Sequence, residues 1–183
     1  FKMDKILPVI QYGHLDYGEN KVQEAIDKWT EIKIKRPEIR LHLIGKLQSN
    51  KAKHAVKLFD YIHSVDNEKL AKKISEEQIK QNKKLKLFIQ VNIGDEDQKS
   101  GISKKRLKEF YEYCINLNLD IIGLMCLPPN EVDPVPFFAD LKKLNEILKL
   151  NDLSMGMSSD FIKAVENSST FLRIGSSIFG QRN

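Results

Sequence analysis

Short apolar runs alternate along the chain with longer segments in which apolar residues recur with a helical period. Short runs are typical of buried strands, and the longer segments are typical of amphipathic helices. Their alternation predicts βα units and a parallel sheet. The seven predicted strands cover residues 14–18, 41–45, 61–66, 85–93, 119–126, 153–157 and 170–175.

The segments between these runs begin with residues that favour helix starts. Asn20 can cap a helix that carries Trp29 on its apolar face. Ser103 can open a second helix, and a third is predicted over residues 136–150 with proline at its start. We expect most apolar residues of these helices to pack in the core.

Seven βα units are one short of a closed eight-stranded barrel. Because the chain begins within a helical pattern, we expect a first strand before Phe1, which would complete a TIM-like (β/α)8 barrel. The alternative is an open doubly wound sheet, but no GxGxxG sequence follows the first predicted strand and no P-loop motif occurs. The prolines between residues 128 and 136 fit one loop, so residues 1–183 predict a single domain without a linker.

The composition narrows the classes of partner. The formal net charge of +5 would suit an anionic ligand, but the basic residues are spread along the chain. The densest basic stretch, Lys80–Lys86, lacks the aromatic residues that stack on bases, so we expect no nucleic-acid partner. No apolar run approaches the roughly 18 residues that a membrane span needs. The two cysteines form no CxxC pair, which excludes a disulfide framework and fits a reducing cytoplasm.

Two successive predicted strands end in sequences suited to an anion. In a parallel barrel the ligand site lies at the carboxyl ends of the strands. Gly175 would let the backbone approach a ligand, and Ser176 opens a short helix with free N–H groups. Ser158 opens a second helix after the preceding strand. Since phosphate sites after the seventh and eighth strands recur in this fold, the sequence predicts one here, the alternative being tight turns and ordinary caps.

Other polar residues suggest less chemistry. His42 lies in an apolar strand and could point into the barrel, although a lone strand histidine is more often a hydrogen-bonded core residue. His54 and His63 do not pair with carboxylates at metal-ligand spacing, and the charged loop 94–101 lacks the ligand pattern of an EF-hand. We expect no metal site. The absence of a GxSxG motif and of an activated cysteine argues against a nucleophilic hydrolase.

Seven strings in this sequence resemble, in order, the motifs of the pyridoxal phosphate homeostasis protein family, whose barrel is similar to the N-terminal domain of alanine racemase. They span essentially the whole chain. The strings are DYGENKVQE, LHLIGKLQSNK, IHSVDNEKLAKKI, IQVNIGDEDQKSGI, IIGLM, LSMGMSSDFIKAV and STFLRIGSSIFGQRN. The most specific features are GEN followed by VQE, IGxLQSNK, and SMGMSxD with RIGxxIFG. Leu41 stands where the family usually has Trp, which affects packing only.

The resemblance implies that the cofactor is pyridoxal 5′-phosphate (PLP) and assigns a role to seven residues. Arg173 would face the pyridine nitrogen, Ser158, Gly175 and Ser176 would hold the phosphate, Asn20 and His42 would line the pocket, and Met157 would lie beside the ring. The phosphate site implied by the family therefore coincides with the one predicted from the strand ends.

The resemblance also implies a function. The protein would be a cytoplasmic, monomeric carrier that holds PLP as a lysine aldimine and buffers it or delivers it to PLP-dependent apo-enzymes, rather than an enzyme. The family's aldimine lysine aligns about two residues before Phe1, outside this chain, while Lys2 and Lys5 fall on the following loop and helix. The alternatives are a racemase-like PLP enzyme acting on amino acids and a barrel that binds a phosphate ester without covalent chemistry.

An arginine at the ring nitrogen bears on the choice between carrier and enzyme. Because the guanidinium stays protonated, Arg173 would disfavour a pyridinium and weaken the ring as an electron sink. Alanine racemase adds a second catalytic base from a further domain, and we expect no counterpart of that domain in this protein. We therefore expect racemase activity not to be the main function.

Overall fold

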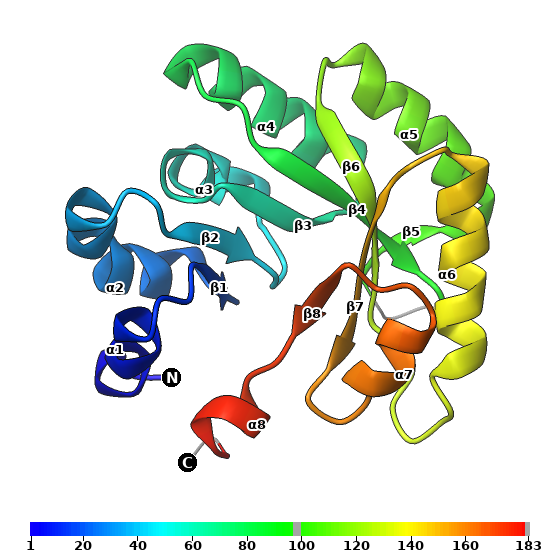
Figure 1. The fold of residues 1–183 in the computed structure, drawn as a ribbon. Coiled ribbons are helices and arrows are strands. Elements are labelled where there is room, and N and C mark those ends of the chain that lie inside the picture. Colours follow the sequence, from blue (N-terminus) through cyan, green and yellow to red (C-terminus); the bar gives the residue numbers. More distant parts are fainter. Residues whose placement is uncertain (97–99, 182–183) are drawn as a thin grey trace.

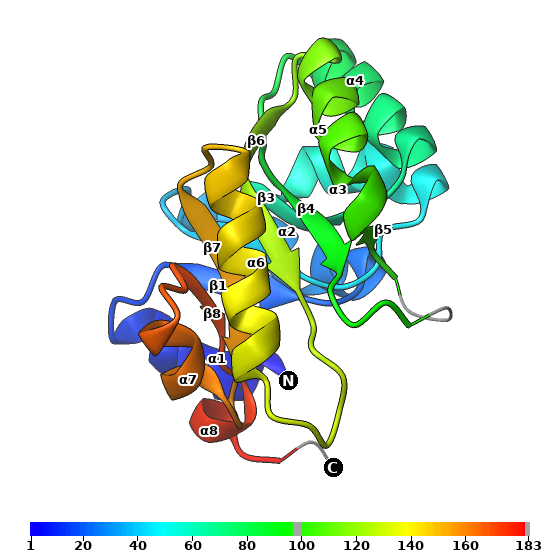
Figure 2. The same ribbon diagram turned by 90° about the vertical axis from the view of Figure 1, so that its right-hand side faces the viewer.

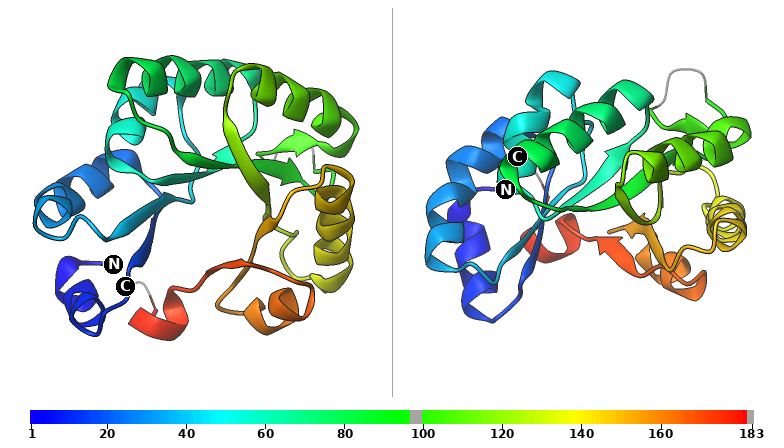
Figure 3. Two further views of the ribbon diagram at one scale, coloured as in Figure 1. Left: turned by 45° about the horizontal axis from the view of Figure 1, so that its top comes forward. Right: turned by 90° about the horizontal axis from the view of Figure 1, so that it is seen from above.

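The strands form a nearly closed parallel barrel with helices on its outside (Figures 1 and 3). The computed structural model describes residues 1–96 and 100–181. In this part of the chain the strand order is β1-β2-β3-β4-β6-β7-β8, with β5 paired to β4, and the recorded pairs are parallel. The strands are β1 (Asp16–Glu19), β2 (Arg40–Leu43), β3 (Tyr61–Val65), β4 (Lys86–Asn92), β5 (Ile102–Ser103), β6 (Asp120–Cys126), β7 (Asp152–Met157) and β8 (Phe171–Arg173). The predicted TIM-like α/β architecture is confirmed.

Helices lie in the connections from β1 to β4 and from β5 to β8, and they cover the outside of the barrel. Figure 2 shows α6 lying along β6 and β7, with which it is in contact. The helices are α1 (Met3–Gln11), α2 (Val22–Lys35), α3 (Ala52–Leu58), α4 (Glu68–Gln81), α5 (Leu107–Asn116), α6 (Val135–Ile147), α7 (Phe161–Glu166) and α8 (Ser176–Phe179), and the short 3₁₀ segments are η1 (Ser49–Lys51) and η2 (Lys104–Arg106).

Two predicted helix starts differ from the structure. The N-cap of α2 is Lys21, in extended conformation and without a side-chain cap, so the prediction that Asn20 caps this helix is wrong. The backbone of Asn20 instead lies against Gly45, where an added Cβ would be 2.2 Å from the Asn20 carbonyl oxygen. The helix predicted to open at Ser158 begins at Phe161, with Asp160 as its N-cap, so that prediction is wrong as well. Ser103 directly precedes η2 and α5, as predicted, but without a side-chain cap.

The sequence missed one strand, β5. It consists of two residues, Ile102 and Ser103, whose Cα partners on β4 are Val91 and Asn92. Two residues carry too little pattern for a strand to be recognised. Residues 97–99 of the charged loop lie outside the described residues.

The two ends of the sheet, β1 and β8, are not joined by a strand pair within the described residues. The first and last helices lie side by side at this place (Figures 1 and 3). The rings of Phe1 and Phe179 are 4.9 Å apart, and Lys5 Nζ donates to the Phe179 carbonyl at 3.2 Å. The strand expected before Phe1 stays a prediction.

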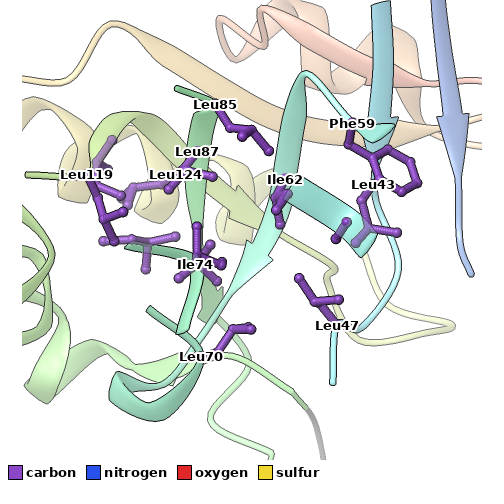
Figure 4. Packing of buried hydrophobic residues seen from close by; sticks show 14 of the residues in the cluster. Leu43, Leu47, Phe59, Ile62, Leu70, Ile74, Leu85, Leu87, Leu119 and Leu124 are labelled. Carbon is purple, nitrogen blue, oxygen red and sulfur yellow. The ribbon is translucent and has the colours of Figure 1, made fainter. Parts of the chain in front are cut away.

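The core has two parts. The larger lies between the strands and the helices and consists mostly of aliphatic residues, and part of it is drawn in Figure 4. Alternate residues of the strands supply it, such as Leu87 and Ile89 on β4. This arrangement explains the almost continuous apolar runs, since strands of a covered parallel sheet are buried on both faces.

The other part of the core fills the inside of the barrel with aromatic rings. His42 stacks on Tyr61 with ring centroids 4.2 Å apart, and His63 stacks on Phe88 at 4.3 Å. Phe171 meets Phe88 edge to face at 5.1 Å. The barrel is therefore packed along its interior, and ligand chemistry is left to its carboxyl end.

Candidate functional site

Arg173 joins the carboxyl ends of three neighbouring strands. It is the last residue of β8 and lies opposite Met157, the last residue of β7. Its Nη2 donates to the carbonyl oxygen of Cys126, which ends β6, at 2.8 Å, and its Nη1 donates to Ser154 Oγ at 2.8 Å. The guanidinium is thus fixed at the end of the barrel where ligands bind in this fold.

The charge of Arg173 is held by neutral partners within the described residues. Burial lowers the pKa of Arg173 from its ordinary value, but a guanidinium stays protonated in proteins. Among the described residues no acidic side chain forms an ion pair with it. Two N–H groups of a possible five are used by Ser154 and Cys126. The fork therefore keeps donors for a ligand.

The loops after β7 and β8 meet at Ser158. Its Oγ accepts the backbone N–H groups of Gly175 at 3.1 Å and Ser177 at 3.4 Å, and its carbonyl accepts Ser177 Oγ at 3.5 Å. The hydroxyl proton of Ser158 is then left to donate. Ser176 begins α8, and within the described chain no acceptor is recorded for its backbone N–H. First-turn N–H groups of this kind bind anions readily.

Gly156 requires glycine because of its backbone conformation, whereas Gly175 does not. Gly175 has a φ of −127°, which other residues adopt, and an added Cβ would lie 3.3 Å from the Phe1 ring. Gly156 has a φ of +94°, and an added Cβ would lie 2.5 Å from Ala164 Cβ on α7. Gly156 therefore sets the path of the strand that delivers Met157 and Ser158 to the site.

Asn20 lies exposed beyond β1, and no side-chain hydrogen bond is recorded for it in the described chain. Glu19, its neighbour in the GEN motif, is buried. Glu19 Oε1 accepts Trp29 Nε1 at 2.8 Å and pairs with Lys28 Nζ at 2.6 Å. Glu19 thus fastens α2 to the end of β1, a role that the sequence reasoning did not recognise.

His42 is a buried, hydrogen-bonded residue inside the barrel, as strand histidines usually are. Its Nε2 lies 3.0 Å from Asp16 Oδ1, and its Nδ1 lies 3.1 Å from His63 Nε2. It does not touch Arg173, and the prediction that it lines a cofactor pocket stays a prediction.

His63 and Ser154 were not among the predicted site residues. His63 Nδ1 lies 2.8 Å from Ser154 Oγ, the same oxygen that accepts from Arg173. The two residues are 91 positions apart in the chain, so no local motif could have paired them. The only signal was their strand position, since His63 follows Tyr61 by two residues and so shares its face.

Met157 borders a pocket of about 230 Å³ between the loops that follow β6 and β7. The loop prolines form one wall, and polar side chains of the β7–α7 segment form the other. The lining residues are Pro128, Pro129, Asn130, Glu131, Val132, Pro134, Met157, Ser159, Asp160 and Lys163. Met157, an exposed residue, thus lines this pocket and is also the strand-register partner of Arg173.

The remaining reactive groups are held in unreactive states. Burial raises the pKa of both cysteine thiols, Cys114 and Cys126, to about 12, so they are protonated at neutral pH. Across residues 1–96 and 100–181, no cluster of three or more His, Cys, Asp or Glu side chains could hold a metal ion. None of the helices in that part of the chain combines the length and the apolar character needed to cross a membrane.

Comparison with known proteins identifies the family. Residues 2–183 match the family described as alanine racemase, N-terminal domain. The pyridoxal phosphate homeostasis protein of Aquifex aeolicus is 40% identical over 176 residues, which cover 91% of this chain and 76% of that protein. The protein of the same name from Vibrio cholerae is 38% identical over 192 residues, 99% of this chain and 81% of that protein.

A solved structure agrees with these relatives. PipY of Synechococcus elongatus PCC7942, without PLP, is 35% identical and superimposes with a TM-score of 0.89, covering 97% of this chain and 87% of PipY. PipY with PLP bound gives the same TM-score and identity over 96% of this chain and 86% of PipY. The family predicted from the motifs is thereby confirmed. The chain belongs to the alanine racemase N-terminal domain family and, within it, to the pyridoxal phosphate homeostasis proteins.

Proposed function

We propose that this protein binds PLP at the carboxyl ends of β7 and β8 and acts in PLP homeostasis. The observation that carries the proposal is the meeting of a phosphate-type cradle and an arginine on two adjacent strands. Ser158 contacts the loop that starts at Gly175, and Arg173 lies two residues earlier on the same strand end. The PLP-bound PipY structure, of the same family, supports this choice of ligand.

The donors at the site suit the phosphate of PLP. Ser158 has a hydroxyl proton to give, and the backbone N–H of Ser176 opens α8. The backbone N–H of Gly175 donates to Ser158 Oγ, which keeps the two loops close together. Hydroxyl and helix-start N–H groups are common phosphate ligands because they present fixed positive ends of dipoles.

At the other end of the cofactor, Arg173 would donate to the pyridine nitrogen. PLP supplies a reactive aldehyde and, when its ring nitrogen is protonated, a strong electron sink. A guanidinium in contact with that nitrogen opposes its protonation. Arg173 therefore favours storage of the cofactor over carbanion chemistry. Met157 would pack beside the ring, and Asn20 and His42 would complete the surroundings.

On this basis we infer a carrier rather than an enzyme. Such a carrier would be a cytoplasmic monomer and would pass PLP to apo-enzymes that depend on it. The names of the relatives, homeostasis proteins, support this role. The residues named above would supply the noncovalent contacts to the cofactor.

The proposal is tested by titrating the protein with PLP and measuring the dissociation constant by calorimetry. Ser158→Ala should weaken binding tenfold or more, because a hydrogen bond to a charged group contributes about 1.5–3 kcal/mol. The matched control is Ser159→Ala, since Ser159 is exposed and lies one residue away. Equal dissociation constants for the two variants would remove Ser158 from the site.

A second variant addresses the ring end of the site. Arg173→Lys keeps the positive charge but loses the planar fork that holds Ser154 and Cys126 together, so binding should again weaken. Arg106→Lys is its control, because Arg106 is an exposed residue paired with Glu68 on another face. Unchanged PLP binding in Arg173→Lys, in a folded protein, would contradict the proposed orientation.

A further inference from the structure

Five polar side chains form a continuous hydrogen-bonded chain through the inside of the barrel, which we call the interior chain. It consists of Asp16, His42, His63, Ser154 and Arg173. Successive side-chain atoms are 3.0, 3.1, 2.8 and 2.8 Å apart. His42, His63 and Ser154 are buried, with 5%, 1% and 0% of their surface exposed. A buried polar network of this kind is costly unless every member is satisfied.

The interior chain runs from one end of the barrel to the other. Asp16 and Arg40 are the first residues of β1 and β2, at the amino ends of the strands. They form a forked ion pair, with Arg40 Nε donating to Asp16 Oδ1 at 2.7 Å and Nη2 to Oδ2 at 2.5 Å. Arg173 is the last residue of β8. The chain thus joins a surface ion pair to the candidate cofactor site on the opposite face.

Its two ends fix the direction of every hydrogen bond. An ionised carboxylate only accepts and a guanidinium only donates. His42 Nε2 must therefore donate to Asp16, which leaves Nδ1 of a neutral His42 to accept from His63 Nε2. A neutral His63 then accepts at Nδ1 from the Ser154 hydroxyl, whose oxygen accepts from Arg173. All donors point from Arg173 toward Asp16.

The titration behaviour of the three ionisable members agrees with this direction. Burial alone would raise the pKa of Asp16. The hydrogen bonds from Arg40 and His42 outweigh this effect, so the pKa lies below its usual value. Burial lowers the pKa of His42 despite Asp16, and burial lowers the pKa of His63 well below its usual value. Both imidazoles are neutral and Asp16 is ionised at neutral pH.

Building on the proposed function, we propose that His63 and Ser154 are positioning residues. Together with His42 they connect Arg173 to Asp16 by hydrogen bonds, and so they orient the Arg173 guanidinium toward the ring nitrogen of the cofactor. A direct carboxylate partner would compete with that nitrogen for the guanidinium. The interior chain avoids this competition, because the Asp16 carboxylate polarises the hydrogen bonds of the neutral side chains, and only a neutral hydroxyl contacts Arg173. The Arg173 fork stays oriented, and its outer N–H groups stay free to donate.

The hydrogen-bond direction can be tested without any cofactor. Imidazole nitrogen spectra of the ¹⁵N-labelled protein at neutral pH should show His42 and His63 as neutral rings protonated at Nε2 and unprotonated at Nδ1. The signals of the exposed His54 serve as the reference for a histidine outside the barrel interior. A cationic ring, or a proton on Nδ1 of either buried histidine, would overturn the directed chain.

The link to the cofactor is tested with two ligands, PLP and its 1-deaza analogue, in which C–H replaces the ring nitrogen. The unmodified protein should bind PLP about tenfold more tightly than the analogue, as expected for a charge-assisted hydrogen bond. Ser154→Ala and His63→Phe should reduce this ratio toward unity. Phe at position 63 can stack on Phe88 as His63 does, and His54→Asn serves as the control that keeps the ratio.

The outcomes separate three accounts. If both variants fold and lower the affinity for PLP and analogue equally, the two residues have only a structural role and the inference fails. If the ratio is unchanged in both variants, the inference fails as well. If the unmodified protein binds neither ligand, the proposed function itself fails, and the imidazole spectra alone decide whether the directed chain exists.

Discussion

At the scale of single residues, polar side chains in this barrel do structural work that local sequence hides. Glu19 lies in the family's GEN motif beside the predicted pocket residue Asn20, yet it is buried against Trp29 and Lys28. His63 has no carboxylate at metal-ligand spacing in the sequence, so it suggested no role. In the structure it bonds to Ser154, which lies 91 positions away in the chain. Such roles depend on strand register, which a pattern of apolar residues does not specify.

Removal of the Glu19 carboxylate should destabilise the protein. In Glu19→Ala the Trp29 N–H and the Lys28 ammonium lose their buried acceptor, and an unsatisfied buried donor costs about 1–3 kcal/mol. Urea unfolding measures the change in free energy. Glu24→Ala, which removes an exposed pair with Lys21, should cost less than Glu19→Ala, because exposed ion pairs contribute little to stability. Equal losses would show that the burial of Glu19 is unimportant.

The buried histidines should make the protein less stable in mild acid. The pKa of His63 is lower in the folded protein than the usual 6.5, so the unfolded chain binds more protons than the folded one below that pH. The contribution of neutral His63 to the free energy of unfolding is therefore fully present above about pH 6.5, and it is lost as the pH falls toward the folded-state pKa. Denaturant unfolding of His63→Phe should show a shallower fall than the unmodified protein. Identical pH profiles would mean that His63 does not titrate on unfolding.

At the scale of elements, the order and position of the main strands followed from their apolar runs. The strand predicted at residues 119–126 agrees closely with β6, because a strand covered on both faces is apolar throughout. The prediction failed at β5, which has two residues, and at the start of α2, where the contact between Asn20 and Gly45 decides the backbone path. That contact is tertiary and leaves no mark on the cap pattern.

Gly45→Ala tests this contact. The added methyl would lie 2.2 Å from the Asn20 carbonyl oxygen, a clash that is relieved only if the turn between β1 and α2 moves away from the segment that follows β2. We expect a loss of about 1–3 kcal/mol in urea unfolding, typical of overpacking. In Gly18→Ala the nearest atom is Ile44 Cδ1 at 3.0 Å, the end of a flexible side chain, so the loss should be smaller. The reverse order of the two losses would contradict the packing described for this turn.

At the scale of the whole molecule, the sequence predicted that polar residues gather at the carboxyl ends of β7 and β8, but it did not predict the interior of the barrel. Ser158 follows β7, Arg173 ends β8 and Gly175 follows it, so the geometry of a parallel sheet brings all three to one face. The interior chain joins β1, β2, β3, β7 and β8, and its existence depends on the register of all of them. No single segment contains the information for it.

Cofactor binding should stabilise the barrel as a unit, because the cradle exists only when β7 and β8 are in register. A ligand that binds only the folded state at a hundred times its dissociation constant adds about 2.7 kcal/mol to the free energy of unfolding. Urea unfolding with and without PLP measures this gain, and Ser158→Ala at the same PLP concentration should show a smaller one. A gain that is equal in both proteins would locate the binding elsewhere.

The most direct test of the central claim is a crystal structure of the protein grown with PLP. We expect the phosphate to contact Ser158 Oγ and the backbone N–H of Ser176, and the ring nitrogen to face Arg173, with Arg173 still bonded to Ser154. A phosphate at these residues with the ring nitrogen turned away from Arg173 would refute the role given to the interior chain. PLP bound at any other part of the barrel would contradict the proposed site altogether.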